Sequence, residues 1–167
     1  MRILVVAMMF FFAGCGGIQT RPIENPESFV AEKPEYEWGD EYEYRWGLKK
    51  TTNTVSGLAW PNVSKLIDFP ISVGKTWQTS EKSKNTRGVE VEFRVRFSVV
   101  DYETVILPSG EFDSFKIRCD NIGGQYAVGW TLYLWYCPSI KNFVKTQTVG
   151  HHTDTPTFEL VSYKLAE

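Results

Sequence analysis

Residues 89–99 read VEVEFRVRFSV, an unbroken alternation of apolar and polar side chains. Because successive side chains of a β-strand point to opposite faces, this pattern gives one apolar face for a core and one charged face for water. A helix would distribute the same residues around its whole circumference. The sequence therefore predicts a long strand here, with one side of its sheet buried.

A turn follows this strand, and the alternation then resumes. Residues 107–112 read LPSGEF, in which Pro108 and Gly110 favour a tight turn. Residues 115–119 alternate again, and Gly123-Gly124 interrupts them. These signals predict a β-hairpin centred on the turn.

Other strand signals lie on both sides of this hairpin, and 58–70 allows at most a short helix because Pro61 and Pro70 limit it. The remaining predicted strands are 42–46, 76–80, 130–137, 143–149 and 158–165. Many short strands joined by tight turns predict a mainly β fold built from a single antiparallel meander. Because such sheets twist, we expect it to be strongly curved, as a half-barrel or open barrel.

The composition fits one globular domain. The 167 residues are 43% hydrophobic, 23% charged and 15% aromatic, and the formal net charge is −2. Aromatic residues at this level suit half-buried strands. No basic stripe is present, so the sequence predicts no nucleic-acid partner.

The N-terminus has the features of an export signal. Arg2 is followed by ten apolar residues, from Ile3 to Phe12, whereas about 20 are needed to span a bilayer as a helix. The sequence therefore predicts a signal peptide over residues 1–14.

Residues 12–15, Phe12-Ala13-Gly14-Cys15, resemble the bacterial lipobox. The resemblance implies a bacterial lipoprotein in which Cys15 carries a diacylglycerol and, on its amine, a further acyl chain such as palmitate. Two or three chains hold a protein firmly in a membrane, whereas a single chain binds only marginally. Gly16 after the cysteine implies the outer membrane, facing the periplasm.

Residues 15–35 contain three prolines and many polar residues, so we expect a lipidated cysteine and a flexible tether there. Residues 36–167 then form the β domain. Within it, residues 69–77 (FPISVGKTW), 107–112 (LPSGEF) and 134–138 (LWYCP) resemble uncharacterised exported β-rich bacterial proteins. In those proteins fPL-x-x-G-x-x-W, P-A-G-x-F and W-Y-x-P segments recur in this order. The resemblance implies a curved open sheet and brings no activity with it.

Signals for catalysis and metal binding are weak. The chain has no Gly-x-Ser-x-Gly elbow and no phosphate-binding glycine loop. His151, His152 and Asp154 form the one cluster that suggests a metal, but neighbouring residues on a strand point apart, which favours a solvated turn. The sequence predicts no enzyme, no cofactor and no metal site.

Two cysteines remain if Cys15 is acylated, and an oxidising compartment makes a disulfide between Cys119 and Cys137 conceivable. Direct pairing would centre the turn near residue 128, whereas the turn signal is at Gly123-Gly124. This register favours the alternative, two buried free thiols.

The aromatic residues Trp130, Tyr133, Trp135 and Tyr136 allow two interpretations. The first is core and cross-strand packing, which the pattern favours. The second is that they face a ligand in a concave cavity able to hold an acyl chain, a glycan or an apolar segment of a partner.

Together these features predict a membrane-anchored envelope protein without enzymatic activity. We expect its curved sheet to bind a partner protein or a hydrophobic ligand. The alternative is a glycan- or peptidoglycan-binding module, since tryptophan and tyrosine rings stack on sugars.

Overall fold

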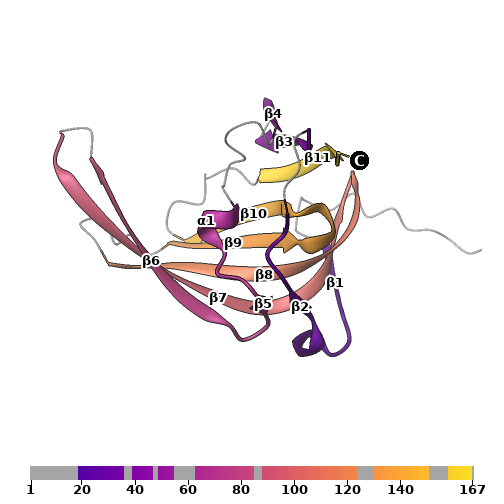
Figure 1. Cartoon of the computed structure of the whole chain (residues 1–167), viewed down its shortest axis with the longest axis horizontal. Coiled ribbons are helices and arrows are strands. Elements are labelled where there is room, and N and C mark those ends of the chain that lie inside the picture. The colour runs from indigo at the N-terminus through magenta and orange to yellow at the C-terminus, as the bar shows by residue number, and fades with distance from the viewer. Residues whose placement is uncertain are drawn as a thin grey trace, which may run out of the picture.

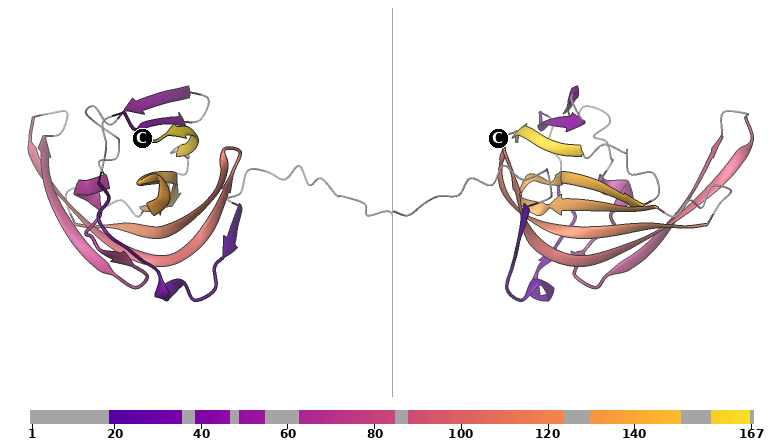
Figure 2. Two further views of the ribbon diagram at one scale, coloured as in Figure 1. Left: turned by 45° about the vertical axis from the view of Figure 1, so that its right-hand side comes forward. Right: turned by 180° about the vertical axis from the view of Figure 1, so that it is seen from behind.

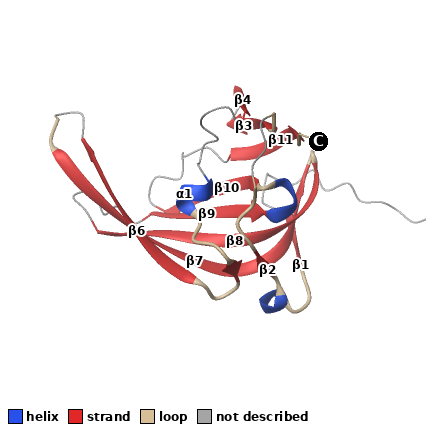
Figure 3. Ribbon diagram, in the orientation of Figure 1, coloured by secondary structure: helices blue, strands red, loops and turns tan. Residues whose placement is uncertain are grey.

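The structure is a computed structural model that describes residues 19–35, 39–46, 49–54, 63–84, 88–123, 130–150 and 158–166. It is mainly β, with one large antiparallel sheet of nine strands and a second sheet of two strands (Figure 1). Helices are limited to single turns within the described ranges (Figure 3). None of these helices has the length and apolarity needed to cross a membrane.

The elements have the following bounds. The strands are β1 (Gln19–Pro22), β2 (Val30–Ala31), β3 (Glu41–Trp46), β4 (Lys49–Thr54), β5 (Ile71–Ser72), β6 (Thr76–Lys84), β7 (Glu90–Leu107), β8 (Gly110–Gly123), β9 (Trp130–Cys137), β10 (Asn142–Gly150) and β11 (Phe158–Lys164). The helical turns are η1 (Pro26–Ser28), α1 (Val63–Leu66) and η2 (Pro138–Ile140).

The predicted hairpin is confirmed. The alternating stretch lies in β7, which continues to Leu107, and the chain reverses at Pro108 and Ser109 into β8. Gly110 has a φ of 141°, which side chains disfavour, so glycine suits this position. Strands β6 to β11 then pair antiparallel in chain order, as the predicted meander requires.

The N-terminal strands depart from this meander. β3 pairs with β11, with β4 outside it, and β1 pairs with β7. β6 covers β7 from Glu90 to Ser98 and β1 covers it from Glu103 to Ile106, so the long strand β7 takes two partners along one edge. The sheet is open, because its path ends at β4 on one side and at β1 and β6 on the other.

The prediction of a flexible tether over residues 15–35 was wrong at two short strands within it. Residues 19–22 form β1, and residues 30–31 form β2, which pairs with β5. β1 is polar because it lies at an exposed edge, and Pro22 is tolerated at the end of an edge strand. The fold therefore begins before residue 36.

Both faces of the main sheet carry a buried cluster. One contains Phe115, Ile117 and Tyr136, and residues of α1, β2 and β5 pack on it. The other contains Trp135 and Cys137 together with residues of β3 and β11. Because adjacent residues of β9 belong to different clusters, the two lie on opposite faces.

The long strands β7 and β8 bend along their length (Figure 2). Register shifts interrupt their pairing between Arg94 and Val95 and between Val99 and Asp101. Extra residues of this kind bend a strand and increase its twist.

Candidate functional site

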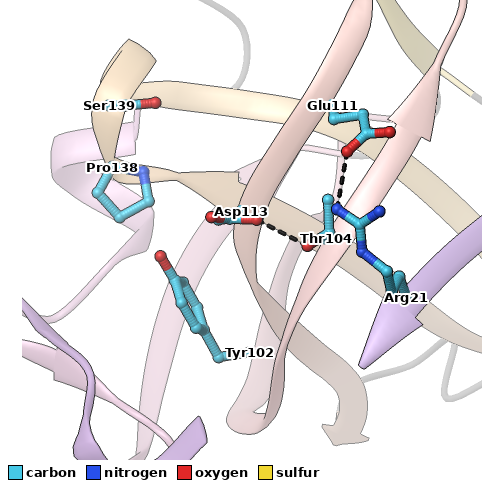
Figure 4. Close-up of a pocket in the computed structure, with 7 residues that line it drawn as sticks. All are labelled: Arg21, Tyr102, Thr104, Glu111, Asp113, Pro138 and Ser139. Carbon is cyan, nitrogen blue, oxygen red and sulfur yellow. Dashed lines mark hydrogen bonds and ion pairs between the residues drawn. The ribbon is translucent and has the colours of Figure 1, made fainter. Parts of the chain in front are cut away.

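A pocket of about 490 Å³ opens where β1 joins β7 (Figure 4). Its lining comes from four elements: β1, β7, β8 and η2. The lining residues are Arg21, Tyr102, Thr104, Glu111, Asp113, Pro138 and Ser139.

The hairpin register explains why these side chains meet. Thr104 of β7 lies directly opposite Asp113 of β8, and its Oγ1 donates a hydrogen bond of 2.7 Å to Asp113 Oδ1. Arg21 of β1 pairs with Thr104 on the other side of β7. Its Nη2 reaches over β7 to Glu111 Oε2 at 2.7 Å. This ion pair is more than half exposed, so it orients β1 rather than adding much stability.

Tyr102 supplies the buried aromatic wall of the pocket. Its ring stacks on Phe29 and is tilted against Phe115, with ring centroids 4.5 Å apart in both pairs. The residue is only 9% exposed, and its hydroxyl points toward Asp113 and Pro138 (Figure 4). Burial, with the nearby Asp113 and then Cys137, raises the pKa of Tyr102 to about 12. The hydroxyl therefore remains protonated at neutral pH and can donate a hydrogen bond.

The lining charges give the pocket an acceptor-rich character. Glu111 and Asp113 are carboxylates, and the guanidinium of Arg21 already pairs with Glu111. Thr104 Oγ1, whose proton goes to Asp113, can still accept a hydrogen bond. The Ser139 hydroxyl, which lies 3.2 Å from Cys137 Sγ, can both donate and accept. Such an arrangement can bind a polar ligand that both donates and accepts hydrogen bonds.

Two of the four aromatic residues expected to face a ligand, Trp135 and Tyr136, lie in the core, which corrects that interpretation for them. Trp135 is 1% exposed and Tyr136 is 0% exposed, while Tyr133 is half-buried. Trp130 begins β9, where the structure fixes its backbone. The rings of Trp135 and Tyr136 fill the two clusters instead of facing a cavity, as the packing alternative predicts.

Trp135 belongs to a buried polar group on one face of the sheet. Its Nε1 donates a 2.8 Å hydrogen bond to Glu103 Oε1, which also lies 3.2 Å from Lys116 Nζ. The same ammonium group lies 5.5 Å from the Trp135 ring and 5.7 Å from the Tyr133 ring. Because the group is internally paired, it offers little to a ligand.

Cys119 and Cys137 are both buried and free, so the alternative of two thiols holds. Cys119 lies opposite Leu132, five residues before Cys137 along β9, which corresponds to about 17 Å of strand. That separation is too large for a disulfide. Burial raises the pKa of the Cys119 thiol well above its usual range.

Several predicted features lie outside the described residues. These are the signal peptide, the lipobox with Cys15, and the cluster of His151, His152 and Asp154. Within the ranges that the structure describes, no group of three or more histidine, cysteine, aspartate or glutamate residues is arranged to hold a metal ion.

Part of the pocket could have been found from the sequence. A turn at Pro108 and Ser109 places Thr104 opposite Asp113 by simple counting. No sequence signal placed Arg21 in the pocket, because residues 19–22, which form β1, were expected to belong to the tether. Searches against protein-family models, curated proteins and solved structures find no match to this chain. Its function is therefore inferred from its own residues.

Proposed function

We propose that the chain is a lipid-anchored envelope protein that binds a partner and catalyses no reaction. In this proposal Cys15 carries the acyl chains and the domain faces the periplasm from the outer membrane. Support comes from the apolar leader and from the lipobox of residues 12–15. β1 starts four residues after Cys15, a distance of at most about 14 Å, so the β1 edge would lie close to the bilayer.

The proposal includes a sheet curved as an open half-barrel. Register shifts in β7, in β10 and in β11 support bending. Ser109 Oγ in the β7–β8 turn also donates a 2.7 Å hydrogen bond to the carbonyl of Leu160 in β11. This bond links two strands that are far apart in the sheet order.

Because the rings expected to line an apolar cavity are buried, a hydrophobic ligand is disfavoured. We favour an envelope partner that binds in the pocket through polar groups. Trp135 and Tyr136 are packed inside, while the pocket beside β1 presents carboxylates and hydroxyls. This convergence of polar groups from four elements is the observation that carries the binding proposal. It also favours the second candidate function, binding of a glycan or of peptidoglycan, because sugars present hydroxyl groups.

Native mass spectrometry of the full chain, extracted from envelope with mild detergent, tests the binding proposal. We expect a mass above that of the lipidated chain, which reveals whether a protein or a carbohydrate is bound. The increment should decrease in Asp113→Asn and persist in Asp68→Asn, which alters an exposed carboxylate outside the pocket. Recovery of the lipidated chain alone would contradict the proposal.

A further inference from the structure

We infer that the pocket beside β1 is a saccharide site that takes one neutral or amino sugar unit, held by Tyr102, Asp113 and Ser139. This inference rests on the proposed function, since it names the ligand class for a non-enzymatic binding protein. Small-molecule sites usually enclose about 300–1,000 Å³, and this pocket has about 490 Å³.

The hydrogen-bonding groups match a sugar. A sugar hydroxyl both donates and accepts, so it pairs with donor and acceptor groups presented together. The Tyr102 hydroxyl makes no hydrogen bond to another described residue and remains a donor at neutral pH. Asp113 uses Oδ1 to accept from Thr104, which orients the carboxylate and leaves Oδ2 for a ligand. Ser139 is exposed at the pocket rim.

Tyr102 is held by ring packing, which lowers the entropic cost of binding at its hydroxyl. The Tyr102 ring packs against Phe29 and Phe115, and its hydroxyl edge points toward Asp113 and Pro138 (Figure 4). The sugar would therefore bind through hydrogen bonds at this edge, not by stacking on the ring. Thr104 and Asp113 are fixed by directly paired strands.

The charges select against an acidic sugar. Asp113 has no cationic partner among the described residues, whereas Arg21 is paired with Glu111. A carboxylate on the sugar would face this excess negative charge, and an ammonium group would be attracted to it. A unit charge about 4 Å away in water changes the energy by roughly 1 kcal/mol, which is about fivefold in affinity.

Saturation-transfer NMR on the full chain in detergent micelles tests this inference. The probes are glucosamine, glucose and glucuronate at slightly acidic pH, where they differ in charge and share a ring. We expect transfer to glucosamine and glucose, and about fivefold weaker binding of glucuronate. Tyr102→Phe and Asp113→Asn should each reduce binding at least several-fold. The matched controls Tyr163→Phe and Asp68→Asn, both on exposed residues outside the pocket, should leave it unchanged.

Three results would overturn the inference: no transfer to any of the three sugars, transfer that both pocket variants retain, or preferred binding of glucuronate. Far-UV circular dichroism of each variant separates loss of binding from loss of folding. If sugars fail to bind while native mass spectrometry still shows a bound protein, the saccharide site is wrong and the binding function stands. If neither sugar nor protein is bound, both are wrong.

Discussion

Replacing Trp135 by phenylalanine should destabilise the fold strongly, because its indole nitrogen is the donor to a buried carboxylate. Trp135 is 1% exposed, and Nε1 lies 2.8 Å from Glu103 Oε1. Phenylalanine keeps most of the ring volume and removes the donor. The substitution therefore tests the hydrogen bond more directly than alanine would.

Three contributions make up the expected loss. A hydrogen bond to a charged group contributes about 1.5–3 kcal/mol. The void left by the smaller ring costs about 1 kcal/mol. The weaker cation–π contact with Lys116, now 5.5 Å from the indole, costs about 0.5 kcal/mol. We expect Trp135→Phe to lower the free energy of unfolding by about 3–4.5 kcal/mol.

The chain offers a matched control in Trp77, which is half-buried. Its Nε1 donates to the Leu66 carbonyl at 3.0 Å, a neutral acceptor worth about 0.5–1.5 kcal/mol. With the same void cost of about 1 kcal/mol added, Trp77→Phe should cost about 1.5–2.5 kcal/mol. Urea unfolding of residues 16–167, followed by far-UV circular dichroism, measures both variants without relying on tryptophan fluorescence. An equal or smaller cost for Trp135→Phe would refute the reasoning about the buried carboxylate.

Three further predictions concern other contacts. Ser109→Ala removes the bond to the Leu160 carbonyl and should lower the urea-derived free energy of unfolding by about 0.5–1.5 kcal/mol, whereas no change would show that the bond contributes nothing. Cys119 and Cys137 should react with a thiol reagent slowly in the native state and completely in denaturant without a reductant; a non-reactive pair in denaturant would show a disulfide. The free energy of unfolding should fall as pH rises from about 10 to about 12, because the Tyr102 hydroxyl ionises at a lower pH in the unfolded chain than in the folded one. Tyr102→Phe should make that decline shallower, as measured by urea unfolding at a series of pH values.

Strands with a clear alternation of apolar and polar residues, or with proline or glycine at their ends, could be predicted from the sequence. β9 has the predicted bounds, since Pro138 ends it, and the β7–β8 turn follows from Pro108 and Gly110. Short polar strands could not be found in this way. β1 and β4 carry polar side chains because each lies at an edge of the sheet, so no apolar periodicity reveals them.

The candidate site likewise has a part that the sequence predicts and a part that it does not. The roles of Trp135 and Tyr136 were open in the sequence, because large rings serve both cores and binding surfaces. Their burial depends on residues of β3 and β11 on one face of the sheet and of the α1 region on the other, which the local pattern does not encode. Tyr102 and Asp113 belong to one hairpin and were predictable as neighbours. The position of Arg21 depends on the long-range pairing of β1 with β7.

The proposed placement of this domain at a membrane depends on acylation of Cys15, so the most direct measurement is the intact mass and location of the mature chain. Membrane-extracted protein should begin at Cys15 and carry the added mass of a diacylglycerol and an acyl chain. Cys15→Ser should remove that mass and shift the protein to the soluble periplasmic or culture fraction. An unmodified Cys15 in envelope-bound protein, or a Cys15→Ser variant that stays with the envelope, would contradict the anchor.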